Sequence, residues 1–324
     1  ARLVLFCAHG STTENNPFES ALDCGACGGN EGKPNARVLA AMANRAPVRE
    51  RLAKRGIIIP ADTHFLAGQV DTTTDEVQLF DLEDAPPTHR KDVARLYDDL
   101  REAAQLTSQE RCARFPDVGA VLPLDKAAGH VAARSADWSQ VRPEWGLSGN
   151  TAFIIGRREL TKGLNLSGRI FLQSYDYRED PTDRWLEVLL TAPQVVAQWI
   201  NMEHYFSAVD NDVYGSGSKI YHNVVGRIGI MSGPWSDLRL GLAWQTVMND
   251  ELPYHEPMRL MTLVEASRAR IEKLIARHEI LQHFYHNEWV HLAALDPEDG
   301  TWYRYMPSGV WRRVQHPSET TQVG

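Results

Sequence analysis

A polar loop near the N-terminus carries the residue types that bind zinc. His9 opens the run HGSTTENNP, and Cys24 and Cys27 follow within LDCGACGG. Imidazole nitrogen and thiolate sulfur are the usual zinc donors, and glycines allow the tight bends that present them. A closed structural site needs four donors, however, and one Cys-x-x-Cys pair supplies two. From these residues alone, local zinc binding, a redox pair and an inert glycine-rich turn all stay open.

The elements around this loop place it at the end of a strand. The apolar run from Leu3 to Ala8 is typical of a buried parallel strand, and the polar stretch 9–33 follows it. We expect a helix from Pro34 onward, kinked or split at Pro47, and a second strand over 57–59. This order is that of a βαβ unit, which puts the loop at the carboxyl end of a strand, where α/β proteins bind ligands.

The first strand also bears on domain organisation. A central strand has neighbours on both sides, so we expect an upstream segment, absent from this chain, to complete its sheet. At about 150 residues per domain, 324 residues make two domains or one large α/β unit. We assign 1–150 to a core with helical insertions, 151–315 to an accessory and partner-docking α/β region, and 316–324 to a tail.

Hydrophobic spacing predicts the remaining elements. Apolar residues three and four apart indicate helices, and short apolar runs indicate strands. An alternating segment around Asp299-Gly300 indicates a hairpin. The predicted helices span 91–115, 124–138, 192–206 and 262–284, the strands 152–155 and 170–172, and the hairpin 289–314. The fold class that these elements favour is α/β with a mixed, largely parallel sheet and flanking helices.

Composition excludes two classes of function. The chain has 34 Lys and Arg against 42 Asp and Glu, a net charge of -8, so it lacks the basic field that a nucleic-acid-binding protein needs. Its apolar runs are far shorter than the roughly 18 residues of a transmembrane helix. Four cysteines are too few for a disulfide scaffold, which favours a reducing, cytoplasmic setting.

Two further patterns predict chemistry less specifically. Glu279, His283 and His286 share one helical face, but the spacing is not His-Glu-x-x-His, and a solvated face is the favoured interpretation. Ser216 and Lys219 in YGSGSK match neither the Walker spacing nor a complete Ser-x-x-Lys enzyme signature. An interface turn or an anion-contacting turn fits that segment equally well.

Several blocks of this sequence resemble the C-terminal half of the DabA family, large subunits of bacterial inorganic-carbon accumulation systems with a β-carbonic-anhydrase-like core. The resemblance runs from about residue 2 to about residue 311, and its first block is specific. The matching blocks are HGST…NNP…LDCGACGG, PNAR, VRPEWGL, TAPQVVAQWIN and YGSGSK…HNVVG. The implied fold is a β-carbonic-anhydrase-like core that an upstream segment completes, with residues 1–150 supplying its C-terminal half.

The resemblance implies a zinc ion (Zn²⁺) held by two cysteines, one histidine and one aspartate. His9 and Cys24 match the histidine and the second cysteine, which leaves Cys27 beside the metal or in a structural role, although spacing alone also allows Cys24 and Cys27 to exchange roles. The other two ligands belong to an upstream Cys-x-Asp-x-Arg motif, and this chain contains no such motif. The implied site therefore closes only when the upstream half is present.

The implied activity is one-way hydration of CO2 to bicarbonate, in which zinc lowers the pKa of water towards about 7. In β-type enzymes the aspartate leaves zinc for the neighbouring arginine before water binds, so site opening is a switch. The family pairs with an antiporter-like, proton-channel membrane subunit of the DabB type, which implies a peripheral position on the cytoplasmic face of the inner membrane. Two other hypotheses stay open: a non-catalytic interaction module with a zinc staple, and a thiol-disulfide module using Cys24 and Cys27.

Overall fold

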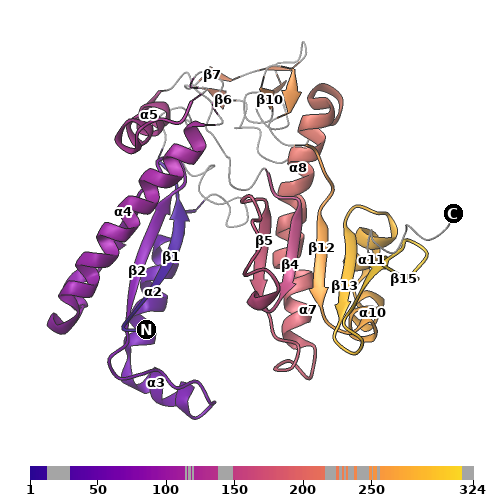
Figure 1. Ribbon diagram of the computed structural model, residues 1–324, viewed down its shortest axis with the longest axis horizontal. Helices are drawn as coiled ribbons and strands as arrows, with labels where there is room; N and C mark the ends of the chain where they lie inside the picture. Colours follow the sequence, from indigo (N-terminus) through magenta and orange to yellow (C-terminus); the bar gives the residue numbers. More distant parts are fainter. Residues whose placement is uncertain are drawn as a thin grey trace. The chain divides into compact units, whose positions relative to one another are not determined.

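The computed structural model of the protein (Figure 1) divides into two compact units, which we describe separately. Unit 1 comprises Ala1–Glu144 and Gly217–Thr246, and unit 2 comprises Trp145–Ser216 and Val247–Gly324. The structure describes residues 1–12, 30–113, 115, 118, 120–137, 149–215, 224–225, 228–229, 231–232, 237–238, 248–249, 251–253 and 256–315. None of the helices in these ranges is both long and apolar enough to cross a bilayer.

Unit 1 is built on a three-stranded sheet in the order β1-β2-β3, with β1 at Leu3–Gly10, β2 at His64–Asp71 and β3 at Val77–Phe80. Strands β1 and β2 run parallel, and β3 is antiparallel to β2. The predicted first strand is therefore confirmed. Within the described residues β1 pairs with β2 alone, which leaves its other edge open.

The second strand was predicted at the wrong place. Residues 57–59 form no strand, and Ile57 and Ile58 are 55% and 81% exposed. The strand that pairs with β1 is HFLAGQVD at 64–71, which contains glycine and polar residues. Leu66 and Ala67, in the first half of this strand, are buried. The second half contains the polar residues Gln69 and Asp71. The isoleucine run misled the prediction because it is apolar and β-branched, yet two of its three side chains are exposed.

One face of this sheet is covered by the helix that follows the loop. Helix α2 (Lys33–Asn44) ends before the extended residue Arg45, and α3 (Ala46–Ala53) begins one residue before Pro47, so the predicted split is confirmed. The small side chains of Ala36 and Ala40 let α2 approach the strands closely, where they pack against Ala67. The helix N-terminus is thereby fixed beside the carboxyl ends of β1 and β2.

Helix α4 (Arg90–Cys112) is tied to the turn after β2, and α5 (Leu124–Ala136) packs on α4. Arg111 of α4 donates to the Asp75 carboxylate at 2.6 Å and to the Thr72 carbonyl at 3.2 Å, and the Ser108 hydroxyl donates to Asp75 at 3.3 Å. The Arg111 and Asp75 side chains are only 10% and 8% exposed. Burial raises the pKa of Asp75, against the lowering effect of Arg111.

Unit 2 holds a six-stranded mixed sheet in the order β15-β14-β13-β12-β4-β5. Strands β13, β12, β4 and β5 are parallel to one another, whereas β14 and β15 continue the sheet antiparallel. The fold class is therefore α/β with mixed sheets, one in each unit. The strands are β4 at Ala152–Gly156, β5 at Ile170–Ser174, β12 at Met261–Glu265, β13 at His291–Asp296, β14 at Thr301–Tyr305 and β15 at Trp311–Arg313.

Two predictions for the C-terminal part had opposite outcomes. The hairpin is confirmed, since β13 and β14 pair around Gly300, whose φ of +66° suits glycine. The long helix over 262–284 is wrong, because the segment forms β12 and then two helices, α10 (Arg268–Arg277) and α11 (Glu279–His286). The β-branched start of the segment joins the sheet, and His278 is extended between the helices.

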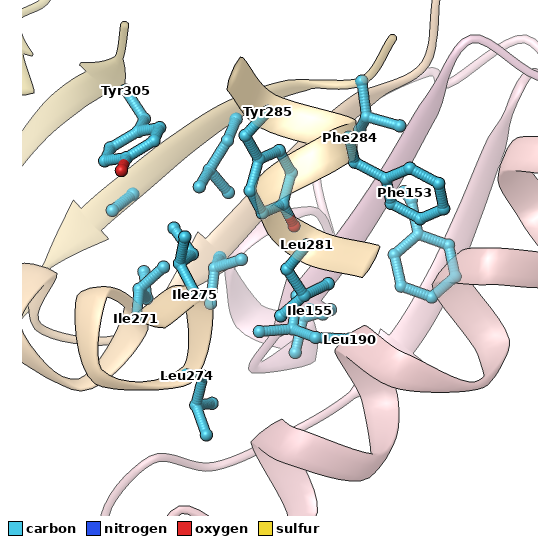
Figure 2. Close-up of a cluster of buried hydrophobic side chains, with 14 of the residues drawn as sticks. Phe153, Ile155, Leu190, Ile271, Leu274, Ile275, Leu281, Phe284, Tyr285 and Tyr305 are labelled. Carbon is cyan, nitrogen blue, oxygen red and sulfur yellow. The ribbon is translucent and has the colours of Figure 1, made fainter. Parts of the chain in front are cut away.

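Helices α10 and α11 supply much of the core of unit 2. Figure 2 shows their side chains gathered with those of β4 in one buried cluster. Helices α7 (Arg184–Thr191) and α8 (Pro193–Tyr214) contribute to the same cluster, so the predicted helix over 192–206 is also confirmed. The labelled core residues are Phe153, Ile155, Leu190, Ile271, Leu274, Ile275, Leu281, Phe284, Tyr285 and Tyr305.

The remaining elements are short. In the described part of the chain, 3₁₀ turns lie at Leu82–Asp84, Pro87–His89 and Arg158–Leu160. Two-residue strands lie at Val224–Val225, Ile228–Gly229, Met231–Ser232, Asp237–Leu238, Met248–Asn249 and Leu252–Pro253.

An ion pair between a buried carboxylate and a partly exposed guanidinium joins the carboxyl ends of β4 and β12. The Glu265 side chain is 2% exposed and accepts hydrogen bonds from the Arg157 main-chain N–H at 3.0 Å and from Arg157 Nε at 2.8 Å. The Arg157 Nη2 group also donates to Glu265. One carboxylate therefore holds both the main chain and the side chain of the residue that follows β4.

The Asp75–Arg111 pair predicts a pH-dependent stability defect for Arg111→Met. The variant leaves a buried carboxylate without its cation, so we expect unfolding to need about 3 kcal/mol less free energy at neutral pH. Removing the cation raises the already raised pKa of Asp75 further, and a protonated Asp75 needs no cation. The defect should therefore be largest above that pKa and shrink as the pH falls through it. Urea unfolding at several pH values measures this, with the exposed Arg95→Met on α4 as control; a defect of constant size would contradict it.

The Arg157–Glu265 pair predicts that Glu265→Ala destabilises unit 2. The variant removes the carboxylate that accepts hydrogen bonds from the Arg157 main-chain N–H and guanidinium. That guanidinium is one-third exposed, so water replaces part of the lost hydrogen bonding. We expect a decrease of about 2 kcal/mol in the free energy of unfolding. Glu159→Ala, at an exposed position near Arg157, is the matched control and should change stability by under about 0.5 kcal/mol. Equal stability of the two variants in urea unfolding would refute the role of the pair.

Candidate metal centre

His9 lies at the carboxyl end of β1, opposite Val70 of β2. Its neighbour Ala8 packs on the side of α2, so side-chain alternation places the His9 imidazole on the opposite face. The residue is exposed, and no group in the described part of the chain forms a hydrogen bond with its ring. Both ring nitrogens are therefore open to a ligand from outside the described residues.

The chain leaves β1 along residues 11–12, which we call the departing arm. Asp71, at the end of β2, accepts hydrogen bonds from the Thr12 N–H at 3.2 Å and from the Thr12 hydroxyl. It also accepts from the Thr73 N–H at 2.9 Å and the Thr73 hydroxyl at 2.5 Å. Burial raises the pKa of Asp71, but these hydrogen bonds outweigh it, so the pKa lies below its ordinary value. An ionised carboxylate thus holds the departing arm.

The chain comes back along residues 30–33, which we call the returning arm. The Gly32 N–H donates to the His9 carbonyl at 2.9 Å. Gln69 of β2 accepts from the Lys33 N–H at 2.9 Å and donates to the Glu31 carboxylate at 3.2 Å. The Lys33 ammonium lies 2.7 Å from Glu31, and its hydrogen bond lowers the pKa of that carboxyl. The returning arm is therefore bound to β1 and β2, and Gln69 satisfies the first N–H of α2.

Close backbone approach makes Gly32 necessary at this point. A Cβ atom on Gly32 would lie 2.7 Å from the Cβ of Ala8 and 3.2 Å from the His9 carbonyl oxygen. Real Cβ atoms do not come so close to other carbon atoms, so any side chain would push the returning arm away from β1. The returning arm and the start of α2 thus lie against the main chain at the end of β1.

The two predicted loop cysteines, Cys24 and Cys27, lie outside the described residues, so their positions relative to His9 stay a prediction. Within the described ranges, no three His, Cys, Asp or Glu side chains gather to hold a metal ion. The donors that can be assigned nevertheless suit zinc, since His9 offers an exposed imidazole and the loop between the two arms carries thiols.

The other candidate residues are Glu279, His283 and His286 on one predicted helix face, and the pair Ser216 and Lys219. His283 lies 3.5 Å from Glu279, both side chains being largely exposed, and His286 binds the Tyr305 hydroxyl at 3.2 Å instead. The three therefore do not converge, which agrees with the solvated-face interpretation. Ser216 and Lys219 lie outside the described residues.

Sequence reasoning did not find Gln69, Asp71 and Thr73, which bind the two arms. A signal was present in the run VDTTTD, where hydroxyl and carboxylate side chains directly follow the apolar part of a strand. It was overlooked because the strand itself had been assigned to residues 57–59.

Comparison with known proteins connects this centre to one family. Residues 1–290 match the family described as "Probable inorganic carbon transporter subunit DabA". Proteins with that name from Thiobacillus denitrificans, Legionella pneumophila (strain Lens) and Aquifex aeolicus are 52%, 49% and 50% identical to this chain. The alignments cover 100%, 97% and 97% of this chain but 31%, 41% and 31% of the relatives. No solved structure matches it.

The chain thus spans between about a third and two fifths of the length of these curated relatives. The similarity covers both units of the structure and includes the strand end, the loop and α2 around His9. On this evidence, the chain belongs to the DabA family of probable inorganic carbon transporter subunits.

Proposed function

We propose that this chain forms part of a subunit that takes up inorganic carbon, and that it supplies two of the four ligands of a zinc site for one-way CO2 hydration. The observation that carries the proposal is the position of His9. Its exposed imidazole lies at the carboxyl end of a parallel strand, two residues before the departing arm of a loop that contains Cys24. The names of the relatives, which call them transporter subunits, support the wider role.

The open edge of β1 supports a site shared with an upstream segment. In the described residues β1 has β2 as a strand neighbour on one side only. A strand added in parallel on the other side would end at the same edge as His9, because carboxyl ends of parallel strands lie together. A Cys-x-Asp-x-Arg motif at the end of that strand would bring a second cysteine and an aspartate to His9 and Cys24.

Each residue has a defined part in this proposal. His9 binds the metal through a ring nitrogen, and β1 fixes the position of its backbone. Cys24 binds as a thiolate, and Cys27 stays beside the metal or in a structural role. A bound zinc ion supplies a Lewis acid that lowers the pKa of water towards about 7, so that CO2 hydration proceeds at neutral pH.

The same proposal includes a partner and a location. An antiporter-like membrane subunit of the DabB type would use an ion gradient to make hydration run one way, with the present subunit docked on the cytoplasmic face of the inner membrane. The competing hypothesis is a zinc staple without catalysis, which the two bound arms also accommodate. The two hypotheses predict the same zinc content but differ in whether the assembly hydrates CO2.

The first test is zinc content, measured by elemental analysis of the chain alone and of the chain combined with its upstream half. We expect about one zinc per complete assembly and loss of zinc in His9→Ala and Cys24→Ala, since each removes one of four ligands. Cys7→Ala is the matched control, because Cys7 is an exposed thiol on the same strand two residues before His9. Full zinc in the chain alone would contradict the shared site, and no zinc in either preparation would exclude a zinc function.

The second test separates catalysis from a staple. Cells that carry the complete transporter with His9→Ala or Cys24→Ala should lose bicarbonate accumulation, measured with labelled inorganic carbon, whereas Cys7→Ala should keep it. The purified wild-type assembly should hydrate CO2 in a stopped-flow pH assay. Accumulation that persists without zinc would leave only a structural role for the metal.

A further inference from the structure

We infer that, in the complete protein, a helix of the upstream segment packs against one side of α2, the side that carries Leu39 and Met42. We call these two residues the α2 flank. The inference rests on the proposed function in one respect, because its occupant is the segment that would also complete the zinc site. It adds a helix-binding surface to the open strand edge of β1, and neither of its residues is a proposed zinc ligand.

The contacts of α2 with the sheet show which way its sides face. Arg37 Nε donates to Asp81 Oδ2 at 2.8 Å, directly after the end of β3. Asn44 Nδ2 donates to the Phe65 carbonyl of β2 at 2.8 Å. Because the sheet order is β1-β2-β3, the side of α2 with Arg37 and Asn44 faces β2 and β3. The opposite side of the helix therefore faces the open edge of β1.

The α2 flank lies on that opposite side. Successive residues of an α-helix are about 100° apart around the axis, which places Leu39 and Met42 roughly 140–160° from Arg37 and Asn44. The two flank residues are 48% and 47% exposed. Phe6 of β1, which packs on the α2 side of the sheet, is also partly exposed. Apolar side chains are thus left exposed both on the α2 flank and on the neighbouring strand.

The hand of crossover connections decides which face of the sheet an upstream helix would cover. A connection between parallel strands of one sheet is almost always right-handed, and β1, α2 and β2 form one such unit. A parallel strand on the open side of β1 that precedes it in the chain would connect to β1 by a step in the same direction. The same hand then places its crossover helix on the face that α2 covers, next to the α2 flank.

The length of the relatives favours this occupant over a second copy of the chain. The alignments cover 31%, 41% and 31% of three curated relatives, so most of each relative lies outside the matched part. That remainder is long enough to supply a strand and its crossover helix. One strand edge cannot pair with both an upstream strand and a second copy. A helix that fits the α2 flank presents apolar side chains three or four residues apart, because that spacing forms one stripe.

The test uses the complete protein, with its upstream segment, and the variants Leu39→Cys and Met42→Cys. Each is treated with N-ethylmaleimide, and mass spectrometry follows the labelling of tryptic peptide 38–45, which contains no native cysteine. Ala41→Cys in the same peptide is one control, because Ala41 is exposed and lies outside the α2 flank. Leu106→Cys on α4 is the matched control, since Leu106 is 49% exposed. In a separate variant benzoylphenylalanine replaces Leu39, and its photo-cross-links identify what covers the flank.

We expect Leu39→Cys and Met42→Cys to react at least about 10-fold more slowly than both controls, because a covered thiol reacts only when the packing opens. The cross-links should join position 39 to upstream peptides of the same molecule in which apolar residues recur every three or four positions. Labelling as fast as in the controls would overturn the inference, and so would cross-links between two copies of this chain. If one flank variant does not fold, the other decides the comparison of rates.

Zinc content of the same samples keeps this inference apart from the proposed function. An α2 flank that labels freely in a protein with one zinc would overturn the inference and leave the zinc function standing. A covered flank with upstream cross-links in a protein without zinc would support the inference, whereas the zinc function would fail.

Discussion

The parallel pairing of β1 with β2 is the interaction on which the rest of this centre depends. Its register places Gly10 beside Asp71 and Ala8 beside Gln69, so the last residues of both strands reach the same edge of the sheet. Main-chain hydrogen bonds fix this register, and side-chain packing of α2 against Ala67 allows no slip, because a one-residue shift would turn every side chain to the other face. His9, both arms of the loop and the start of α2 take their positions from that single alignment.

Sequence reasoning correctly predicted the elements in which the spacing of apolar residues matches the face that is buried in the structure. Helix α4 shows regular apolar spacing and no internal breaker, so local sequence and tertiary context favour the same structure. The segment 262–284 was different, because apolar periodicity continues across a buried strand and two helices. Periodicity cannot report that the first residues of such a segment are enclosed by β4 and β13, which come from distant parts of the chain.

At the candidate centre, sequence reasoning could identify ligand types but not the groups that hold them. His9 and the loop cysteines are recognisable because few residues have their metal chemistry. Gln69, Asp71 and Thr73 are common polar residues, and their role follows only from which main-chain groups they meet after β1 and β2 pair. Such contacts join positions some forty to sixty residues apart, and no local pattern encodes them.

The open edge of β1 has a consequence for the handling and biogenesis of the protein. Among the described residues β1 pairs on one side only, and an apolar strand with such an edge is a template for intermolecular strand pairing. With LVLFCA in its sequence, β1 has no charged residue between Leu3 and Ala8 that would discourage such contacts. Unless another strand covers it, such an edge favours association between copies of the isolated chain.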